Sequence, residues 1–285
     1  MPIDPSVAIG ADLGTAEFSW NTSDVLLYQL ALGAGADPLS ARELRYATEK
    51  DTVVLPSFAT VAQNFHATEP PKVSFPGIEI DLAKVVHGSQ SVTAHRPLPT
   101  SGRATARTRI IDVHDKGKAA VIWQETEVVD EAGEPLWTSR SSIFARGEGG
   151  FGGDRGPSEK IELPDRAADA IVDVPTIGQQ ALIYRLCGDR NPLHSDPAFA
   201  KAAGFDAPIL HGLCTYGIVA KAVTDAVLDG DAAKVGSWSA KFAGIMLPGE
   251  TLRVRIWRAD DRHLVTAESV ERGAPVLSDA VFTAR

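Results

Sequence analysis

The chain has 285 residues, a length that suits one large domain or two domains of about 140 residues each. Hydrophobic residues make up 44% of it, which is enough for a substantial core and excludes a disordered or fibrous protein. The formal charge of −9 arises from 37 acidic and 28 basic residues without a run of Lys or Arg, so no nucleic-acid partner is expected.

The two cysteines, Cys187 and Cys214, are too few for a disulfide framework or a metal cluster, and we expect them to be small packing residues. Neither the start of the chain nor its interior offers a signal peptide or an apolar run of membrane-spanning length. We therefore expect a soluble, cytoplasmic protein that has no membrane partner.

In chain order, residues 1–20 predict a short lead-in, and residues 21–24 carry helix-start side chains. The apolar residues that follow predict a helix that ends at Gly33 and Gly35. Residues 147–160 are rich in glycine and predict an exposed linker between two halves. Runs typical of β-strands are 104–113, 119–129 and 136–145 before this linker, and 235–246, 251–258, 264–272 and 276–283 after it.

The most informative stretch runs from Tyr184 to Gly212 and reads YRLCGDRNPLHSDPAFAKAAGFDAPILHG. Pro192 prevents one continuous helix from carrying both Asp189 and His194, so we expect both on a loop. A carboxylate and an imidazole that converge on one water molecule can act as general acid and base. Gly212 precedes a long apolar helical pattern, and a backbone N–H at a helix start can stabilise an oxyanion. This combination suits chemistry next to a carbonyl group.

An internal repeat predicts that the two halves are copies of one domain. The segment LLYQLALGAGADPLS resembles LIYRLCGDRNPLHS in the second half. The matched positions are Tyr28 with Tyr184, Pro38-Leu39 with Pro192-Leu193, and Val86-His87-Gly88 with Leu210-His211-Gly212.

The two copies differ in their chemistry. The first has small residues at 34–36 and Ser40 where the second has the acid–base pair, so we expect one active site per chain. After its His-Gly pair the first copy soon reaches prolines, whereas the second continues GLCTYGIVAKAVTDAV, which predicts a buried helix. The absence of a long helix predicts free room in the first half.

The stretch from Tyr184 to Pro197 resembles the signature of the MaoC-like (R)-specific enoyl-CoA hydratases, also called hydratase 2. Their pattern, an aromatic residue followed by R-L-(S/C)-G-D-x-N-P-L-H-x-D-P, is met position by position, and the chain is similar to the hydratase domain of the peroxisomal multifunctional enzyme type 2. The resemblance implies an α+β double hot-dog fold, in which the first half lacks a full central helix. The expected parts are a first half at 1–146, the linker at 147–160 and a second half at 161–285.

The resemblance also implies a reaction, the reversible hydration of trans-2-enoyl-CoA to (3R)-3-hydroxyacyl-CoA without a metal or another cofactor. Asp189 and His194 would hold the attacking water, Asn191 would orient them, and the N–H of Gly212 would bind the thioester oxygen. The implied substrate contacts are His87, Gly88, Lys116, Arg190, Pro192, Leu193 and Phe242. Without the resemblance, each of three of these residues has an equally good structural explanation. Lys116 would be a solvated lysine of a turn, Phe242 a core residue of a strand, and His87 a remnant of the repeat.

Three other functions remain open at the level of sequence. The same chemistry can run as dehydration on an acyl carrier protein, a hot-dog thioesterase would hydrolyse similar thioesters, and an acyl-CoA sensor would only bind them. Retention of both Asp189 and His194 argues against the sensor, because binding alone requires neither. Two halves in one chain make both a monomer and a homodimer credible.

Overall fold

The computed structural model describes residues 3–69, 74–81, 85–158 and 160–285. Its strands are β1 (Asp12–Trp20), β2 (Val85–Ala94), β3 (Gly102–Asp115), β4 (Ala119–Asp130), β5 (Pro135–Arg146), β6 (Ala170–Pro175), β7 (Val235–Phe242), β8 (Thr251–Ala259), β9 (Arg262–Ser269) and β10 (Ala274–Ala284). Its α-helices are α1 (Pro5–Ala8), α2 (Thr22–Ala31), α3 (Ala41–Ala47), α4 (Gln180–Tyr184), α5 (Pro197–Ala202) and α6 (Gly212–Leu228). Short 3₁₀ helices are η1 (Pro56–Thr60), η2 (Ala62–Asn64), η4 (Arg185–Cys187), η5 (Pro192–His194) and η6 (Ala232–Lys234).

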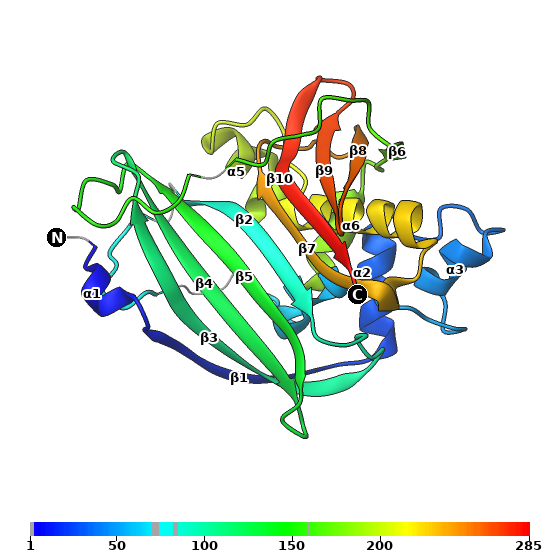
Figure 1. Cartoon of the computed structure of the whole chain (residues 1–285), viewed down its shortest axis with the longest axis horizontal. Coiled ribbons are helices and arrows are strands. Elements are labelled where there is room, and N and C mark those ends of the chain that lie inside the picture. Colours follow the sequence, from blue (N-terminus) through cyan, green and yellow to red (C-terminus); the bar gives the residue numbers. More distant parts are fainter. Residues whose placement is uncertain (1–2, 70–73, 82–84, 159) are drawn as a thin grey trace.

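All of these strands belong to one ten-stranded antiparallel sheet, in the order β1-β3-β4-β5-β2-β7-β10-β9-β8-β6 (Figure 1). Each half contributes a first strand, a helical region and then four strands. The halves meet where β2 pairs with β7, from Ser89 opposite Lys241 to Thr93 opposite Ser237. On β7, Trp238 and Ala240 are buried in a core that also contains residues of the first half. The two copies therefore share one sheet and one main core.

The predicted buried helix of the second half is confirmed as α6, whose residues 214–224 are all buried. The charged Lys221 is compensated there, because its Nζ lies 2.6 Å from Glu43 of α3 and 2.8 Å from Asp225. The helix ends at Asp229, which adopts a left-handed conformation with φ of 51°. None of the described helices is long and apolar enough to cross a membrane.

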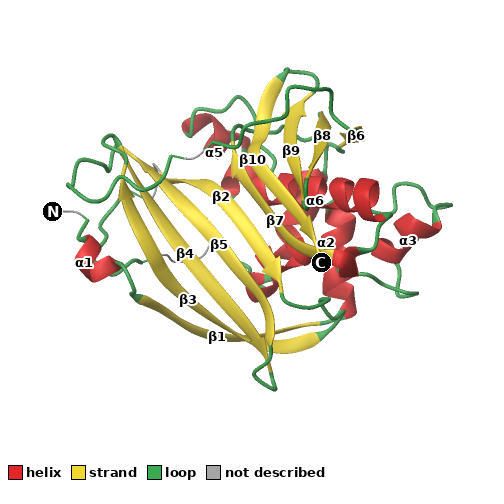
Figure 2. Ribbon diagram, in the orientation of Figure 1, coloured by secondary structure: helices red, strands yellow, loops and turns green. Residues whose placement is uncertain are grey.

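The first half lacks a comparable helix among its described residues, as the sequence predicted. Between α3 and β2 the described chain forms only the short η1 and η2. Figure 2 shows the larger helices gathered behind the strands of the second half, away from β3 and β4. A cavity of about 430 Å³ lies against β2, β4 and β5, and it is bounded by η1, η2 and Leu213 of α6. The predicted room in the first half is therefore present.

Three strands were not predicted, and one of them, β2, lies inside the sheet. Residues 1–20 are not only a lead-in, because they include β1, and β6 precedes α4 in the second half. These two strands are the opposite edges of the sheet. An edge strand has a neighbour on one side only, so its sequence carries fewer of the buried apolar residues that mark a strand. The burial pattern of β1 shows this, since only Trp20 among its residues is buried.

Most of the described residues of the predicted linker that follow β5 are exposed, but one part of the stretch packs against the first half. Phe151 is buried in a second, smaller core cluster. The carboxylate of Asp115, at the end of β3, accepts hydrogen bonds from the N–H groups of Gly150 and Gly152, both at 2.8 Å. This part of the stretch therefore packs against the β3–β4 turn. Residue 159, inside the predicted linker, lies outside the described residues.

Candidate active site

The loop that carries the motif begins at a turn that requires glycine. Gly188 ends η4 with φ of 107°, and a Cβ on it would lie 1.9 Å from the carbonyl oxygen of Asn64. Any residue other than glycine would be strained at this φ, and its Cβ would clash with the carbonyl oxygen of Asn64. The first half of the chain therefore packs directly on the motif loop. The Nε of Arg190 adds to this packing by donating to the carbonyl oxygen of Ala67 at 3.2 Å.

Two side chains shape the loop between Asp189 and His194. The Oδ1 of Asp189 accepts a hydrogen bond from the N–H of Asn191 at 3.1 Å, and the Oδ1 of Asn191 accepts one from the N–H of Leu193 at 3.0 Å. Such turns are typical of Asp and Asn, whose short side chains reach the backbone two residues ahead. Pro192 then begins η5, which ends at His194. The geometry fits an orienting role for Asn191.

The imidazole of His194 is buried, and its protonation follows from its hydrogen bond. Its Nδ1 lies 2.9 Å from the carbonyl oxygen of Ile209. Because a carbonyl oxygen only accepts, Nδ1 must carry the proton and the neutral ring keeps its lone pair on Nε2. Burial lowers the pKa of His194 below its ordinary value of 6.5. The ring is therefore a neutral base at physiological pH.

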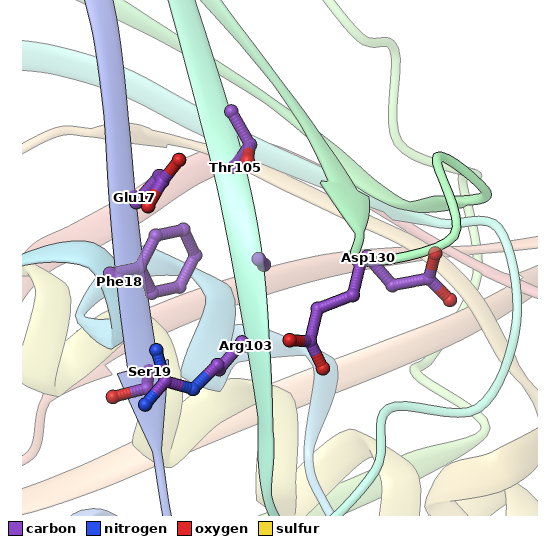
Figure 3. Close-up of a pocket in the computed structure, with 8 residues that line it drawn as sticks. Glu17, Phe18, Ser19, Arg103, Thr105 and Asp130 are labelled. Atoms are coloured by element: carbon purple, nitrogen blue, oxygen red, sulfur yellow. The ribbon is translucent and has the colours of Figure 1, made fainter.

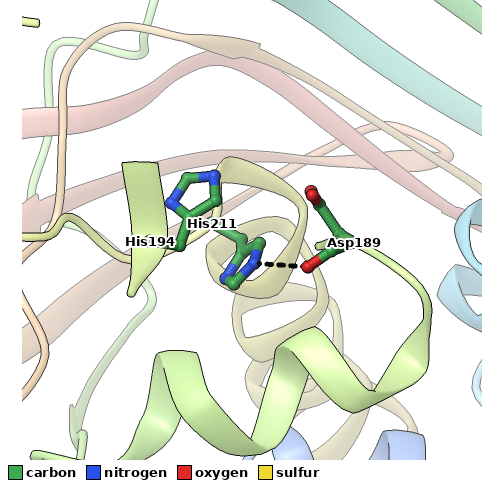
Figure 4. A group of neighbouring side chains, drawn as sticks. All are labelled: Asp189, His194 and His211. Carbon is green, nitrogen blue, oxygen red and sulfur yellow. Dashed lines mark hydrogen bonds between the residues drawn. The ribbon is translucent and has the colours of Figure 1, made fainter. Parts of the chain in front are cut away.

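A second histidine, His211, belongs to the same cluster (Figure 4). Its ring stacks on that of His194, with centroids 3.7 Å apart and an angle of 29° between the planes. Its Nε2 lies 3.3 Å from the backbone carbonyl oxygen of Asp189. One polar side-chain atom from each of Asp189, His194 and His211 lies within 4.8 Å of the other two. The structure thus brings the predicted pair together and adds a third member.

The sequence places His211 directly before Gly212 and indicates no role for its side chain. The ring is fully buried, and it also contacts Tyr184 with centroids 4.9 Å apart. Burial, and secondarily the neighbouring His194, lower the pKa of His211 to about 2, so the ring is neutral. A single polar residue inside the apolar run PILHGLC was the available signal.

Gly212 begins α6, and it is exposed although the preceding His211 is buried. Its N–H belongs to the first turn of the helix, where backbone donors have no partner within the helix. A Cβ on Gly212 would lie 3.1 Å from Cε1 of Phe242. The Phe242 ring in turn contacts the His87 ring, with centroids 4.7 Å apart. Three residues predicted from distant parts of the sequence therefore meet at the start of α6.

The proposed match of His87-Gly88 with His211-Gly212 is wrong as a structural equivalence. His87 lies in β2, not before a helix, and the strand at the same place in the second half is β7. The Nε2 of His87 is buried without a hydrogen-bond partner among the described residues, and the ring lines the cavity of the first half. Burial lowers the pKa of His87 to about 4. A Cβ on Gly88 would lie 2.7 Å from the Oγ of Ser142, so Gly88 serves the packing of the sheet.

The other predicted contacts are more dispersed. Lys116 lies in the β3–β4 turn, where its Nζ donates to the carbonyl oxygen of Pro157 at 2.9 Å. It does not line the cavity that His87 lines. Arg190, Pro192 and Leu193 belong to the motif loop, where the interactions described above involve backbone groups. Their contacts with a substrate, and that of Lys116, stay predictions.

A larger hollow of about 510 Å³ lies elsewhere, beside β1 and β3 (Figure 3). Its lining is formed by Glu17, Phe18, Ser19, Arg103, Ala104, Thr105, Asp130 and Glu131. None of the predicted site residues lies in it. Several of its charged side chains, such as Glu17 and Arg103, are exposed, and Asp130 pairs with Arg96. The smaller cavity is the one connected to the motif, through Leu213.

The buried neutral histidines predict that folding stability falls in acid. His211 and His87 have folded pKa values of about 2 and about 4, below the ordinary 6.5. Below pH 6.5 the unfolded chain therefore binds protons that the folded chain excludes, and stability falls until the pH reaches the folded pKa. Each such group contributes up to about 1.4 kcal/mol per pH unit. Urea unfolding at pH 7, 6 and 5 should show a shallower pH dependence for His211→Phe than for the native chain, and equal slopes would contradict the assignment.

Comparison with known proteins identifies the family of both halves of the chain. Residues 18–147 match the MFE-2 hydratase 2 N-terminal domain, and residues 160–280 match the MaoC like domain. An enoyl-CoA hydratase of Mycobacterium tuberculosis is 58% identical over 267 residues, covering 94% of this chain and 93% of that protein. The crystal structure of a MaoC-like dehydratase from Phytophthora capsici is 30% identical with a TM-score of 0.90, covering 99% of this chain and 98% of that one.

A third likeness concerns the fold alone. A protein of Mycobacterium tuberculosis described as having a double hotdog fold shares 14% identity with a TM-score of 0.58, over 99% of this chain and 98% of that one. Together with the strand order of the two halves, these likenesses confirm the predicted double hot-dog architecture.

Proposed function

The chain belongs to the MaoC-like dehydratase family, with a first half of the MFE-2 hydratase 2 type, and we propose that it reversibly hydrates trans-2-enoyl-CoA to (3R)-3-hydroxyacyl-CoA. The observation that carries this proposal is the convergence of Asp189 and His194, close to the exposed start of α6 at Gly212. A hydro-lyase needs a base for water, an acid for the carbanion carbon and a donor for the thioester oxygen. This site contains candidates for all three.

In the proposed mechanism, Asp189 and His194 hold one water molecule over the double bond. The free Nε2 of His194 takes a proton from the water, whose oxygen then bonds to C3 of the substrate. As negative charge moves to the thioester oxygen, the N–H of Gly212 stabilises it. The acid–base pair returns a proton to C2, so the net change is the addition of one water. The 3R configuration rests on the family membership.

We propose that no metal and no further cofactor takes part, and that coenzyme A enters only as part of the substrate. Asp189, His194 and His211 have the composition of a metal site and lie close enough for one. However, the rings of His194 and His211 are stacked at 29°, so their nitrogen lone pairs lie in nearly parallel planes. A tetrahedral ion requires ligands that converge from different directions. The Nε2 of His211 also faces the carbonyl oxygen of Asp189 and must donate to it.

The nearest alternative is the same chemistry run as dehydration on an acyl carrier protein, and the relative from Phytophthora capsici is named a dehydratase. Both reactions would use the motif loop with Asp189 and His194. They differ in whether coenzyme A or an acyl carrier protein carries the acyl group. A thioesterase would instead direct water at the carbonyl carbon. The relative with 58% identity is named an enoyl-CoA hydratase, which favours addition of water to the double bond over hydrolysis of the thioester. A cytoplasmic location and a homodimer stay predictions from the sequence.

Absorbance of the enone band of crotonyl-CoA tests the proposed function. Purified protein should remove this absorbance without releasing free thiol, and a metal chelator should leave the rate unchanged. Release of thiol would indicate a thioesterase. Loss of activity with the chelator, restored by a divalent metal, would show that the cluster is a metal site after all.

A further inference from the structure

The side of the first-half cavity that the sheet forms is partly polar, although an acyl chain is apolar. Five polar side chains from three strands line it and form what we name the polar band: Gln90, Gln124, Thr126, Ser139 and Ser141. The strand register makes the band continuous, because Gln124 lies opposite Ser141 and Thr126 lies opposite Ser139. Gln90 of β2 in turn lies opposite Ser141. The band therefore crosses the inner face of the sheet from β4 to β2.

Apolar residues border the polar band along the strands. Toward one end of β4 and β5 lie Val128 and Trp137, which belong to the main core. Toward the other end lie Ile122 and Ala145, which belong to the smaller core cluster. A cavity built only for an alkyl chain would continue this apolar lining across the middle, as the interior of a β-sandwich does. The band interrupts it.

Part of the band is satisfied by the protein itself. The Oγ of Ser139 accepts from Nε2 of Gln90 at 2.7 Å, and the hydroxyls of Thr126 and Thr108 lie 2.9 Å apart. Within the described residues, no side-chain hydrogen bond is found for Gln124 or Ser141, although both line the cavity. These two neighbours thus present an amide and a hydroxyl to whatever occupies it.

An unsubstituted alkyl chain over Gln124 and Ser141 would remove water from both groups and offer no hydrogen bond in return, which is unfavourable. An oxygen function at this place would accept from the Gln124 amide or exchange hydrogen bonds with Ser141. β4 lies two strands from β2, so at the usual strand spacing Gln124 is roughly 10 Å from the line of β2 that carries His87. The matching oxygen must therefore lie several carbons beyond the double bond.

We propose that the polar band binds a hydroxyl or ketone oxygen on the acyl group, remote from the thioester, and that this enzyme prefers enoyl-CoA substrates that carry one. This inference rests on the proposed hydratase function. Leu213 and Ile143, which lies opposite His87, supply apolar surface on the near side of the band, and Val128 and Trp137 supply it beyond the band. Gln124 and Ser141 then act as specificity-determining residues without contact with the reacting atoms.

The test compares kcat/KM for trans-2-enoyl-CoA substrates of eight, ten and twelve carbons with their ω-hydroxy counterparts. For at least one length the native enzyme should prefer the hydroxylated chain by about tenfold, the effect of one hydrogen bond to a group that the bound chain would otherwise leave unpaired. Gln124→Leu should reduce this preference to near unity. The matched control is Glu127→Gln, a substitution of an exposed residue on the same strand, which should keep it.

Equal or better hydration of the plain chain at every length would overturn the inference, and would mean that the band only holds water. A preference that survives in both Gln124→Leu and Ser141→Ala would also overturn it, because the oxygen would then bind elsewhere. Thermal unfolding of each variant shows whether a changed ratio reflects a folded protein. If no enoyl-CoA of any kind is hydrated, the proposed function itself fails, which is a different result.

Discussion

Replacing Asp189 by Asn or His194 by Ala is expected to lower kcat/KM for trans-2-enoyl-CoA by roughly 10²- to 10⁴-fold. Each change removes one of the two groups that hold and deprotonate the attacking water. The double variant should be little worse than either single one, because residues that act as a unit are not additive in rate. Steady-state kinetics on a ten-carbon enoyl-CoA measures all three.

Asp196→Asn provides the matched control, since it makes the same chemical change within the same signature. Asp196 caps α5, where its Oδ1 accepts from the N–H of Ala198 at 2.8 Å. Asparagine caps a helix about as well as aspartate does, so turnover and stability should be kept. Near-normal hydration by Asp189→Asn, or an equal loss in Asp196→Asn, would contradict the assignment of the acid–base pair.

Gly212→Val is expected to lower kcat/KM by roughly 10²- to 10³-fold, the usual effect of losing one oxyanion donor. A backbone N–H cannot be deleted, but bulk displaces it. The added side chain would press on the Phe242 ring, which already lies 3.1 Å from the position of a Cβ. Gly212→Ala should have a smaller effect, because the ring needs to move by only a few tenths of an ångström.

A second substitution separates displacement from a general loss of stability. Phe242→Leu removes the ring that a Cβ at Gly212 would meet, so it should restore part of the activity of Gly212→Ala. If Gly212→Val has near-native kcat/KM, the N–H at the start of α6 is not the oxyanion donor. If adding Phe242→Leu to Gly212→Ala restores thermal stability but not activity, displacement of the N–H by the ring does not explain the loss of activity.

The sequence predicted those parts of the structure that depend on local patterns. Pro192 and the short polar side chains around it determine the loop, and this loop holds Asp189 and His194 as expected. The apolar period after Gly212 predicted α6, because a helix buried on most sides has apolar residues around most of its circumference. The inner strands other than β2 were predicted from their β-favouring apolar residues, because at least one face of each strand contacts other residues.

The parts that were missed depend on contacts between distant segments. The role of His211 follows from its stacking on His194 and its contact with Asp189, which spacing does not show. The contact between Asn64 and Gly188 joins the two halves, and neither residue's neighbours in sequence indicate it. The repeat also misled, because His87-Gly88 and His211-Gly212 agree in letters while one pair lies in a strand and the other begins a helix.

The most direct measurement of the central claim is the identity of the product. Purified protein is incubated with trans-2-decenoyl-CoA, and the 3-hydroxyacyl-CoA formed is oxidised in separate reactions by dehydrogenases specific for the 3R or the 3S alcohol. A water held by Asp189 and His194 on one face of the substrate predicts a single enantiomer. The family membership assigns this enantiomer as 3R, so only the 3R-specific enzyme should oxidise the product, and His194→Ala should form far less product than the native chain. Oxidation by the 3S-specific enzyme, or unchanged product formation by His194→Ala, would contradict the account.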